Sequence, residues 1–158
     1  PTPPTPPPTE TATRSPTPSV TPSASATATP SVISTPTFSM QSTLADIQTT
    51  IFDVNCSTLG CHNGVDLAGN LSLDPGSSYA DLVGVPPDNS AAFDDGFLRV
   101  DPGHPDNSFL LTKLILPTVF DALFGSRMPS GVPPLDAHQI EQIRAWILRG
   151  ALADEPVP

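Results

Sequence analysis

Two cysteines and a histidine lie together in the segment Cys56-Ser57-Thr58-Leu59-Gly60-Cys61-His62, which contains both cysteines of the chain. A pair of thiols can add to the two vinyl groups of a haem, and an imidazole directly after the second cysteine can then bind the iron. The usual attachment motif has two residues between the cysteines, whereas this segment has four. The residue types therefore allow covalent haem attachment without establishing it.

The same two cysteines allow two other interpretations. Cys56 and Cys61 can close a small disulfide loop in an oxidising compartment, and His62 would then be incidental. A structural zinc site is a weaker alternative, because two cysteines and one histidine leave the tetrahedral ligand set one residue short. From this segment alone, haem attachment, a disulfide and a metal site all stay open.

A haem iron that carries electrons without binding substrate needs a second axial ligand. Met128 is the best candidate, because it lies in an expected loop and Pro129 restricts the backbone after it. Its thioether sulfur would stabilise ferrous iron and so raise the reduction potential, although loop methionines also commonly fill gaps in a core. His104 is the alternative ligand, whereas His138 and Met40 are weaker candidates.

The composition changes near residue 40. Residues 1–40 are mostly Pro, Thr, Ser and Ala, with Glu10 as the one acid and Arg14 as the one base. Such a segment buries too little apolar surface to offset its chain entropy, and its prolines favour an extended conformation. We therefore expect an extended arm or linker over residues 1–40 and one small domain over residues 41–158.

The net charge of −10 falls entirely on the expected domain, because the two charges of the arm cancel. An acidic domain does not bind nucleic acid through its general electrostatic field. No apolar run is long enough for a transmembrane segment, and the motifs of the common hydrolases and nucleotide-binding enzymes are missing. We expect an electron carrier that is not an enzyme, while an enzyme with an open position at the haem iron would require that Met128 does not bind.

The hydrophobic pattern predicts a mainly helical fold. Helices are expected from residue 43 directly into Cys56, over residues 105–115, and over residues 136–149 behind an acidic cap. Residues 88–96 are expected to be an acidic loop, and residues 118–134 to be mostly loop. The apolar shell of the site is expected to consist of Leu44, Ile47, Phe109, Leu110, Ile143, Trp146 and Ile147.

Four features occur in a characteristic order along the chain. The helix and cysteine segment are followed by Arg99-Val100-Asp101-Pro102-Gly103 with Asn107-Ser108-Phe109-Leu110-Leu111, then by Arg127-Met128-Pro129 and a closing amphipathic helix. Over residues 43–153 this order resembles the small monohaem c-type cytochrome domains of bacterial exported proteins. The resemblance implies a cytochrome c-like helical domain with long loops, thioether bonds at Cys56 and Cys61, and iron ligation by His62 and Met128. The four-residue spacer is its departure from the usual motif.

The resemblance predicts electron transfer through one covalent haem c. The partner would be a redox protein, a membrane electron-transfer complex or further copies of the chain assembled through the arm. A Pro/Thr-rich arm before a small acidic domain is common in exported proteins, so we expect a periplasmic or cell-surface location, with a lipid anchor upstream of Pro1 as one means of attachment. The alternative from another class is a haem-free interaction or assembly module, stapled by a disulfide and carried on a Pro/Thr stalk.

Overall fold

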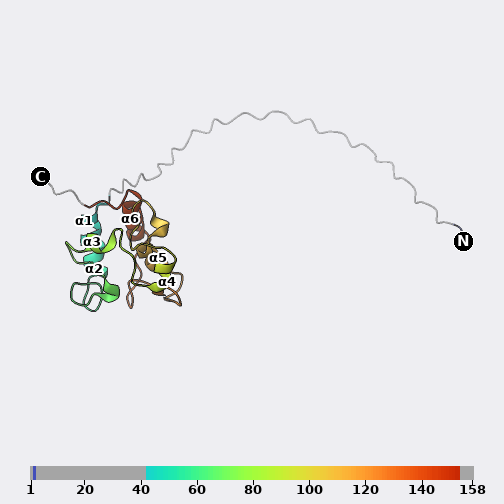
Figure 1. Ribbon diagram of the computed structural model, residues 1–158, viewed down its shortest axis with the longest axis horizontal. Helices are drawn as coiled ribbons and strands as arrows, with labels where there is room; N and C mark the ends of the chain where they lie inside the picture. The colour runs from blue at the N-terminus through green and yellow to red at the C-terminus, as the bar shows by residue number, and fades with distance from the viewer. Residues whose placement is uncertain (1, 3–41, 154–158) are drawn as a thin grey trace, which may run out of the picture. The chain divides into compact units, whose positions relative to one another are not determined.

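The computed structural model describes Thr2 and residues 42–153. The described residues from 42 onward belong to one compact unit, Phe38–Pro158 (Figure 1). The predicted arm, apart from Thr2, and the candidate ligand Met40 lie outside the described residues. Within the described part, none of the helices has the length and apolar character needed to cross a membrane.

The described part of the chain is mainly helical, as the hydrophobic pattern predicted, with long irregular connections. In chain order its elements are α1 (Leu44–Ile47), the π-helical turn η1 (Gln48–Phe52), α2 (Asp53–Asn55), the 3-10 turn η2 (Ala68–Asn70), α3 (Ser78–Leu82), α4 (Ser90–Asp94), the 3-10 turn η3 (Pro105–Asn107), α5 (Phe109–Ile115), β1 (Phe120–Asp121), β2 (Gly125–Ser126) and α6 (Ala137–Leu148).

The first helical run consists of α1, η1 and α2 and ends directly before Cys56, as predicted. Thr43 begins it with a capping box: its hydroxyl accepts the Asp46 N–H at 3.1 Å, and the Asp46 carboxylate accepts the Thr43 N–H at 3.1 Å. The wide π turn places the sequence neighbours Ile51 and Phe52 both in the interior, where each is fully buried. The run thus delivers Cys56 at a position fixed by core packing.

The last helix, α6, begins and ends as its sequence predicts. Asp136 and Gln139 form a reciprocal capping box, with N–H···O distances of 2.8 and 3.1 Å. Gly150 follows the helix at φ +98°, a left-handed conformation that favours glycine. The helix buries Ile143, Trp146 and Ile147 and leaves Ile140 partly exposed.

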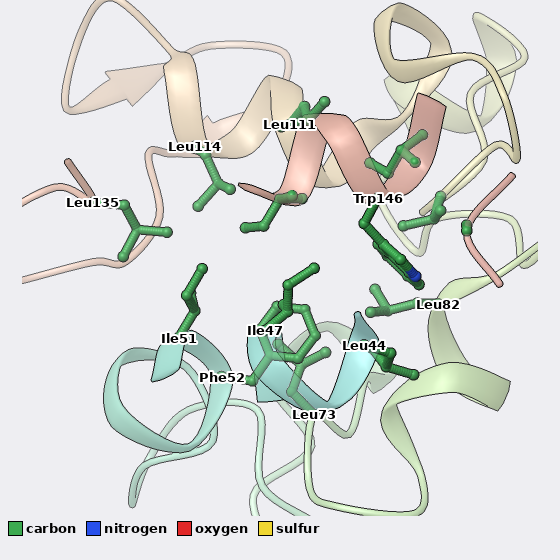
Figure 2. Close-up of a cluster of buried hydrophobic side chains, with 14 residues drawn as sticks. Leu44, Ile47, Ile51, Phe52, Leu73, Leu82, Leu111, Leu114, Leu135 and Trp146 are labelled. Carbon is green, nitrogen blue, oxygen red and sulfur yellow. The ribbon is translucent and has the colours of Figure 1, made fainter. Parts of the chain in front are cut away.

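The core lies between the first helical run and the helices α5 and α6, and α6 contacts both α1 and α5. Figure 2 shows side chains of the first helical run, of α5 and of α6 meeting in this core. Each fully buried apolar side chain stabilises the fold by about 1.5–3 kcal/mol. Cys56 and Met128 pack against the edge of this cluster. The main members from the helices are Leu44, Ile47, Ile51, Phe52, Leu111, Leu114, Ile143, Trp146 and Ile147.

Residues 88–96 contain a short helix, so the prediction that this segment is a loop was wrong. They contain α4, and the Asn89 side chain caps it by accepting the Ala92 N–H at 2.9 Å. Asn89 also donates to the backbone carbonyl oxygen of Leu123 at 3.0 Å. The acidic composition suggested a loop, whereas the capping asparagine and this long-range contact favour a short helix.

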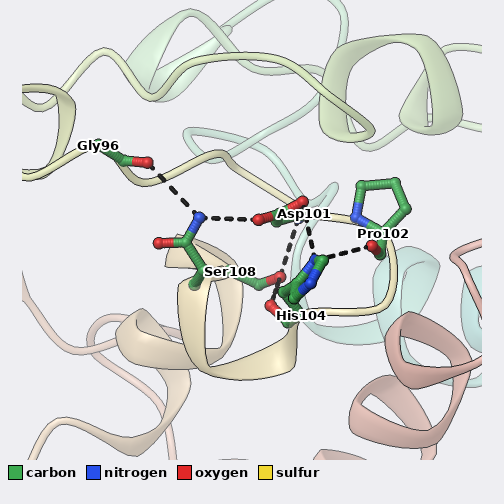
Figure 3. Close-up of polar contacts among 6 residues, drawn as sticks. Gly96, Asp101, Pro102, His104 and Ser108 are labelled. Carbon is green, nitrogen blue, oxygen red and sulfur yellow. Dashed lines mark hydrogen bonds and ion pairs between the residues drawn. The ribbon is translucent and has the colours of Figure 1, made fainter.

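The helix predicted over residues 105–115 is broken at Ser108, where φ is −97° and ψ is 111°. The fully buried Ser108 hydroxyl accepts the Asp101 N–H at 2.9 Å and donates to the His104 carbonyl oxygen at 3.0 Å (Figure 3). These two bonds compete with continuous helical pairing. The chain therefore forms η3 and α5 as separate elements.

The segment 118–134 is mostly irregular, as predicted, and within it lies the short antiparallel pair of β1 and β2. In its register Phe120 lies opposite Ser126, and Asp121 lies opposite Gly125. This small hairpin comes directly before Met128. The hairpin therefore determines where the chain enters the segment that contains Met128.

Candidate functional site

A cavity of about 330 Å³ lies beside the end of the first helical run. This volume is within the range of small-molecule and cofactor sites. Of the four residues predicted for the site, Cys56, His62 and Met128 line the cavity, whereas Cys61 does not. The fold thus brings a thiol, an imidazole and a thioether from distant parts of the sequence to one cavity.

His62 is held by its backbone and by its ring. Its N–H donates to the Cys56 carbonyl oxygen at 3.0 Å, and its carbonyl oxygen accepts the Leu73 N–H at 2.6 Å. Its Nδ1 lies 2.7 Å from the Ala68 carbonyl oxygen, and because a carbonyl only accepts, Nδ1 carries the proton. In the neutral ring the lone pair is then on Nε2, which is the form that binds a metal ion.

The electrostatic surroundings of His62 favour this neutral form. Burial of the ring lowers the pKa of His62, the hydrogen bond to Ala68 opposes the shift, and the charges of Lys113 and Arg99 add to it. The two cations therefore act on the imidazole from the same cavity lining.

The two cysteines differ in their surroundings, and both are free thiols. Cys56 packs against the core and lines the cavity, and burial, with a smaller effect of the nearby Cys61, raises the pKa of its thiol to about 12. The spacer between them turns at Gly60, whose φ of +78° favours glycine. Cys61 is partly exposed in the same loop but outside the cavity lining.

Met128 returns to the cavity directly after the hairpin. It is partly buried against the core cluster, and its N–H donates to the Lys113 carbonyl oxygen at 2.8 Å. The Met128–Pro129 peptide bond is cis. The thioether thus lies at the cavity, on a segment attached to α5.

Sequence reasoning did not single out two cations that line the cavity, Arg99 and Lys113. Within residues 42–153 neither forms an ion pair, since the hydrogen bonds of both go to backbone carbonyl oxygens. Among these described residues neither cation is paired with a carboxylate within 4 Å, although Asp88 also lines the cavity and the charge of Asp121 acts on Lys113. The one available signal was Lys113 itself, a single cation within the apolar helix Phe-Leu-Leu-Thr-Lys-Leu-Ile.

The other candidate ligands lie elsewhere. The His104 side chain is 72% exposed, and its Nδ1 is 3.1 Å from the Pro102 carbonyl oxygen and 3.5 Å from the Asp101 carboxylate (Figure 3). His138 is exposed in the first turn of α6. Neither histidine lines the cavity.

The expected apolar shell needs a correction. Phe109 and Leu110 do line the cavity, but the other five residues lie on helix faces that pack against one another in the core. A helical pattern shows which face is buried, but not which neighbour that face meets. The apolar wall is completed instead by Leu71, Leu73, Leu82, Leu114 and Phe124.

Comparison with known proteins gives no match to a family model, to a curated protein or to a solved structure. Among the residues that the structure describes, no three His, Cys, Asp or Glu side chains gather in a group that could hold a metal ion. The fold and site together define a small, mainly helical domain with a largely apolar cavity that is also lined by a thiol, an imidazole, a thioether, two cations and one carboxylate.

Proposed function

We propose that this chain is an exported c-type cytochrome, which binds one haem covalently and transfers single electrons without catalysing bond chemistry. The observation that carries the proposal is the convergence of Cys56, His62 and Met128 on one apolar cavity. A disulfide module requires neither the methionine nor the histidine at the same cavity. The iron of a single electron-transfer haem would need two protein ligands, and the cavity offers His62 and Met128 for these places.

The residues of the cavity fit the chemistry of a haem. A haem has an apolar macrocycle and two carboxylates, and the cavity combines an apolar wall with two cations, Arg99 and Lys113, and one acid, Asp88. His62 would bind the iron through Nε2, while its Nδ1 is oriented by the Ala68 carbonyl oxygen. Met128 would supply the second axial ligand through its thioether.

A bound haem supplies a one-electron Fe(III)/Fe(II) couple. The chain would tune that couple by its surroundings: the apolar wall limits water, and the thioether and the two cations favour ferrous over ferric iron. Cys56 would hold the haem at the cavity. Cys61 lies outside the cavity lining, so the two thioether bonds are tested separately below.

One haem needs a partner for useful electron flow. We place this partner among redox proteins, membrane electron-transfer complexes or further copies of the chain. Because bacteria attach haem to such motifs outside the cytoplasm, the proposal includes a periplasmic or cell-surface location.

The first test is the visible spectrum of the full chain, produced in cells with the haem-attachment machinery. We expect a sharp α-band after reduction, colour that survives denaturation and acid–acetone extraction, and a mass increase equal to one haem. Cys56→Ala and Cys61→Ala should each retain haem through one bond, whereas the double variant should lose it on extraction. A colourless protein would overturn the proposal.

The haem-free alternative rests on the two thiols sharing one short loop, close enough for the charge of Cys61 to affect Cys56. It predicts a mass two hydrogens below that of the reduced chain, with no visible absorption. The same purified sample therefore decides between the two functions.

A further inference from the structure

Lys113 contacts three points of the segment that ends at Met128. Its ammonium group donates to the carbonyl oxygens of Phe124, at 2.7 Å, and of Ser126. Its own carbonyl oxygen accepts the Met128 N–H at 2.8 Å. One residue of α5 thus holds residues 124, 126 and 128 through both its side chain and its backbone.

The position of this cation is unfavourable apart from those contacts. Burial lowers the pKa of Lys113, which Asp121 only partly opposes. The Phe109 ring, 5.9 Å from Nζ, and the two carbonyl oxygens offset part of this cost. An apolar side chain could fill the same site without the cost of burying a charge. The ammonium group is therefore explained by the carbonyl oxygens to which it donates.

We propose that Lys113 is a positioning residue, whose ammonium group holds the segment 124–128 against α5 and so keeps the Met128 thioether at the cavity. The role of Lys113 in iron binding by Met128 rests on the proposed function. Its role in attaching the segment 124–128 to α5 does not, because that attachment also exists in the haem-free chain.

Arg99 provides a matched control. It is the other cation of the cavity lining, and it also donates only to backbone carbonyl oxygens, those of Asp81 (2.9 Å), Gly69 (3.2 Å) and Asn70 (3.0 Å). None of these belongs to the segment of Met128. Arg99→Leu therefore removes the same charge from the same cavity and leaves the methionine segment attached, but it also removes the hydrogen bonds to the turn that begins at Ala68, the acceptor of the His62 ring.

The haem-loaded full chain is compared with Lys113→Leu, Lys113→Arg and Arg99→Leu, because leucine brings no second thioether to the cavity. The readouts are the weak far-red band of methionine-bound ferric haem and the affinity of the ferric protein for added imidazole, which competes with the thioether. For Lys113→Leu we expect loss of the band and about tenfold tighter imidazole binding, equivalent to about 1.4 kcal/mol. Lys113→Arg should keep the band, because a guanidinium retains the charge and can donate to both carbonyls.

Arg99→Leu separates positioning from charge. Both leucine variants should lower the reduction potential, since each removes a cation near the iron, but only Lys113→Leu should change the band and the imidazole affinity. An unchanged band in Lys113→Leu overturns the proposal. Equal loss of the band in Arg99→Leu, in a chain whose haem-free form keeps the Nδ1 proton of His62 by nitrogen NMR, also overturns it, because charge alone would then explain the effect.

A second readout needs no haem. Amide hydrogen exchange at Met128 should become about tenfold faster in the haem-free Lys113→Leu chain, while exchange in α6 stays unchanged, which also shows that the variant folds. Unchanged exchange at Met128 overturns the positioning role. If the wild-type protein binds no haem, the proposed function is overturned instead. Amide hydrogen exchange at Met128 then still tests whether Lys113 attaches the segment 124–128 to α5.

Discussion

The imidazole of His62 donates its Nδ1 proton to the backbone carbonyl oxygen of Ala68 across 2.7 Å. Ala68 begins η2, and the carbonyl oxygens of the next two residues, Gly69 and Asn70, accept from Arg99. The acceptor that orients the ring is therefore part of a turn that a long-range contact holds in place. Since a backbone carbonyl does not titrate, the orientation of His62 does not change with pH through its partner.

This contact makes a prediction for the haem-free protein. Nitrogen NMR of the His62 ring should show the neutral tautomer with its proton on Nδ1. Its titration should fall below that of the unfolded chain, because burial lowers the pKa of His62. A ring with its proton on Nε2 at neutral pH would contradict the assignment.

Replacement of Met128 tests the second axial ligand. Met128→Ala should retain covalent haem, lose the far-red ferric band and have a lower reduction potential, because a thioether stabilises ferrous iron. His104→Ala should leave the spectrum and potential unchanged, since its side chain is exposed and outside the cavity lining. A wild-type spectrum in Met128→Ala would mean that another group binds the iron.

Gln48 joins the first helical run to two later segments. Its buried amide donates to the Leu73 carbonyl oxygen at 2.7 Å and to Asp53 at 2.6 Å, and its oxygen accepts the Ser78 hydroxyl at 2.6 Å. Gln48→Leu should lower the free energy of unfolding by about 1–3 kcal/mol, because buried polar partners lose their bonds. Thr50→Ala, at an exposed position of the same turn, should change it by less than about 0.5 kcal/mol in the same urea titration.

Asp66 couples stability to pH in the cysteine loop. Its carboxylate accepts the Gly60 N–H at 2.6 Å and the Asn63 amide at 2.7 Å, and these bonds lower the pKa of Asp66 from its ordinary 3.8. The folded state then binds fewer protons than the unfolded state, so this stabilisation is present above the ordinary pKa and is lost as pH falls through the folded value.

Asp66→Asn should therefore be less stable than the wild type near neutral pH, and the difference should shrink in strong acid. Urea unfolding at about pH 7 and about pH 2.5 measures this difference. A constant difference at both pH values would show that the carboxylate charge does not contribute.

The parts of the fold that could be predicted depend on local chemistry. Thr43 with Asp46, and Asp136 with Gln139, satisfy the first N–H groups of their own helices, and such caps can be recognised within four residues of sequence. The break at Ser108 could not be predicted, because its cause includes a bond to Asp101 seven residues away.

The site divides in the same way. Residue types and order indicated Cys56, His62 and Met128, and the structure places all three around one cavity. The place of Cys61 depends on how its loop turns, and the roles of Lys113 and Arg99 depend on carbonyl groups of distant segments. Every residue carries the same backbone carbonyl group, so the sequence does not show which carbonyl oxygens will accept a hydrogen bond from a given cation.

The π-helical turn η1 sets how a change in chain length before Cys56 affects the site. Successive residues of an α-helix are rotated by about 100° around its axis, and η1 accommodates one more residue in a turn than an α-helix does. Deleting a single residue within η1 would therefore allow an ordinary α-helical turn and leave Cys56 facing the cavity. Deleting a residue in α1 instead would rotate the residues before it by about 100° relative to Cys56, so the site should tolerate a change in length at η1 better than at α1.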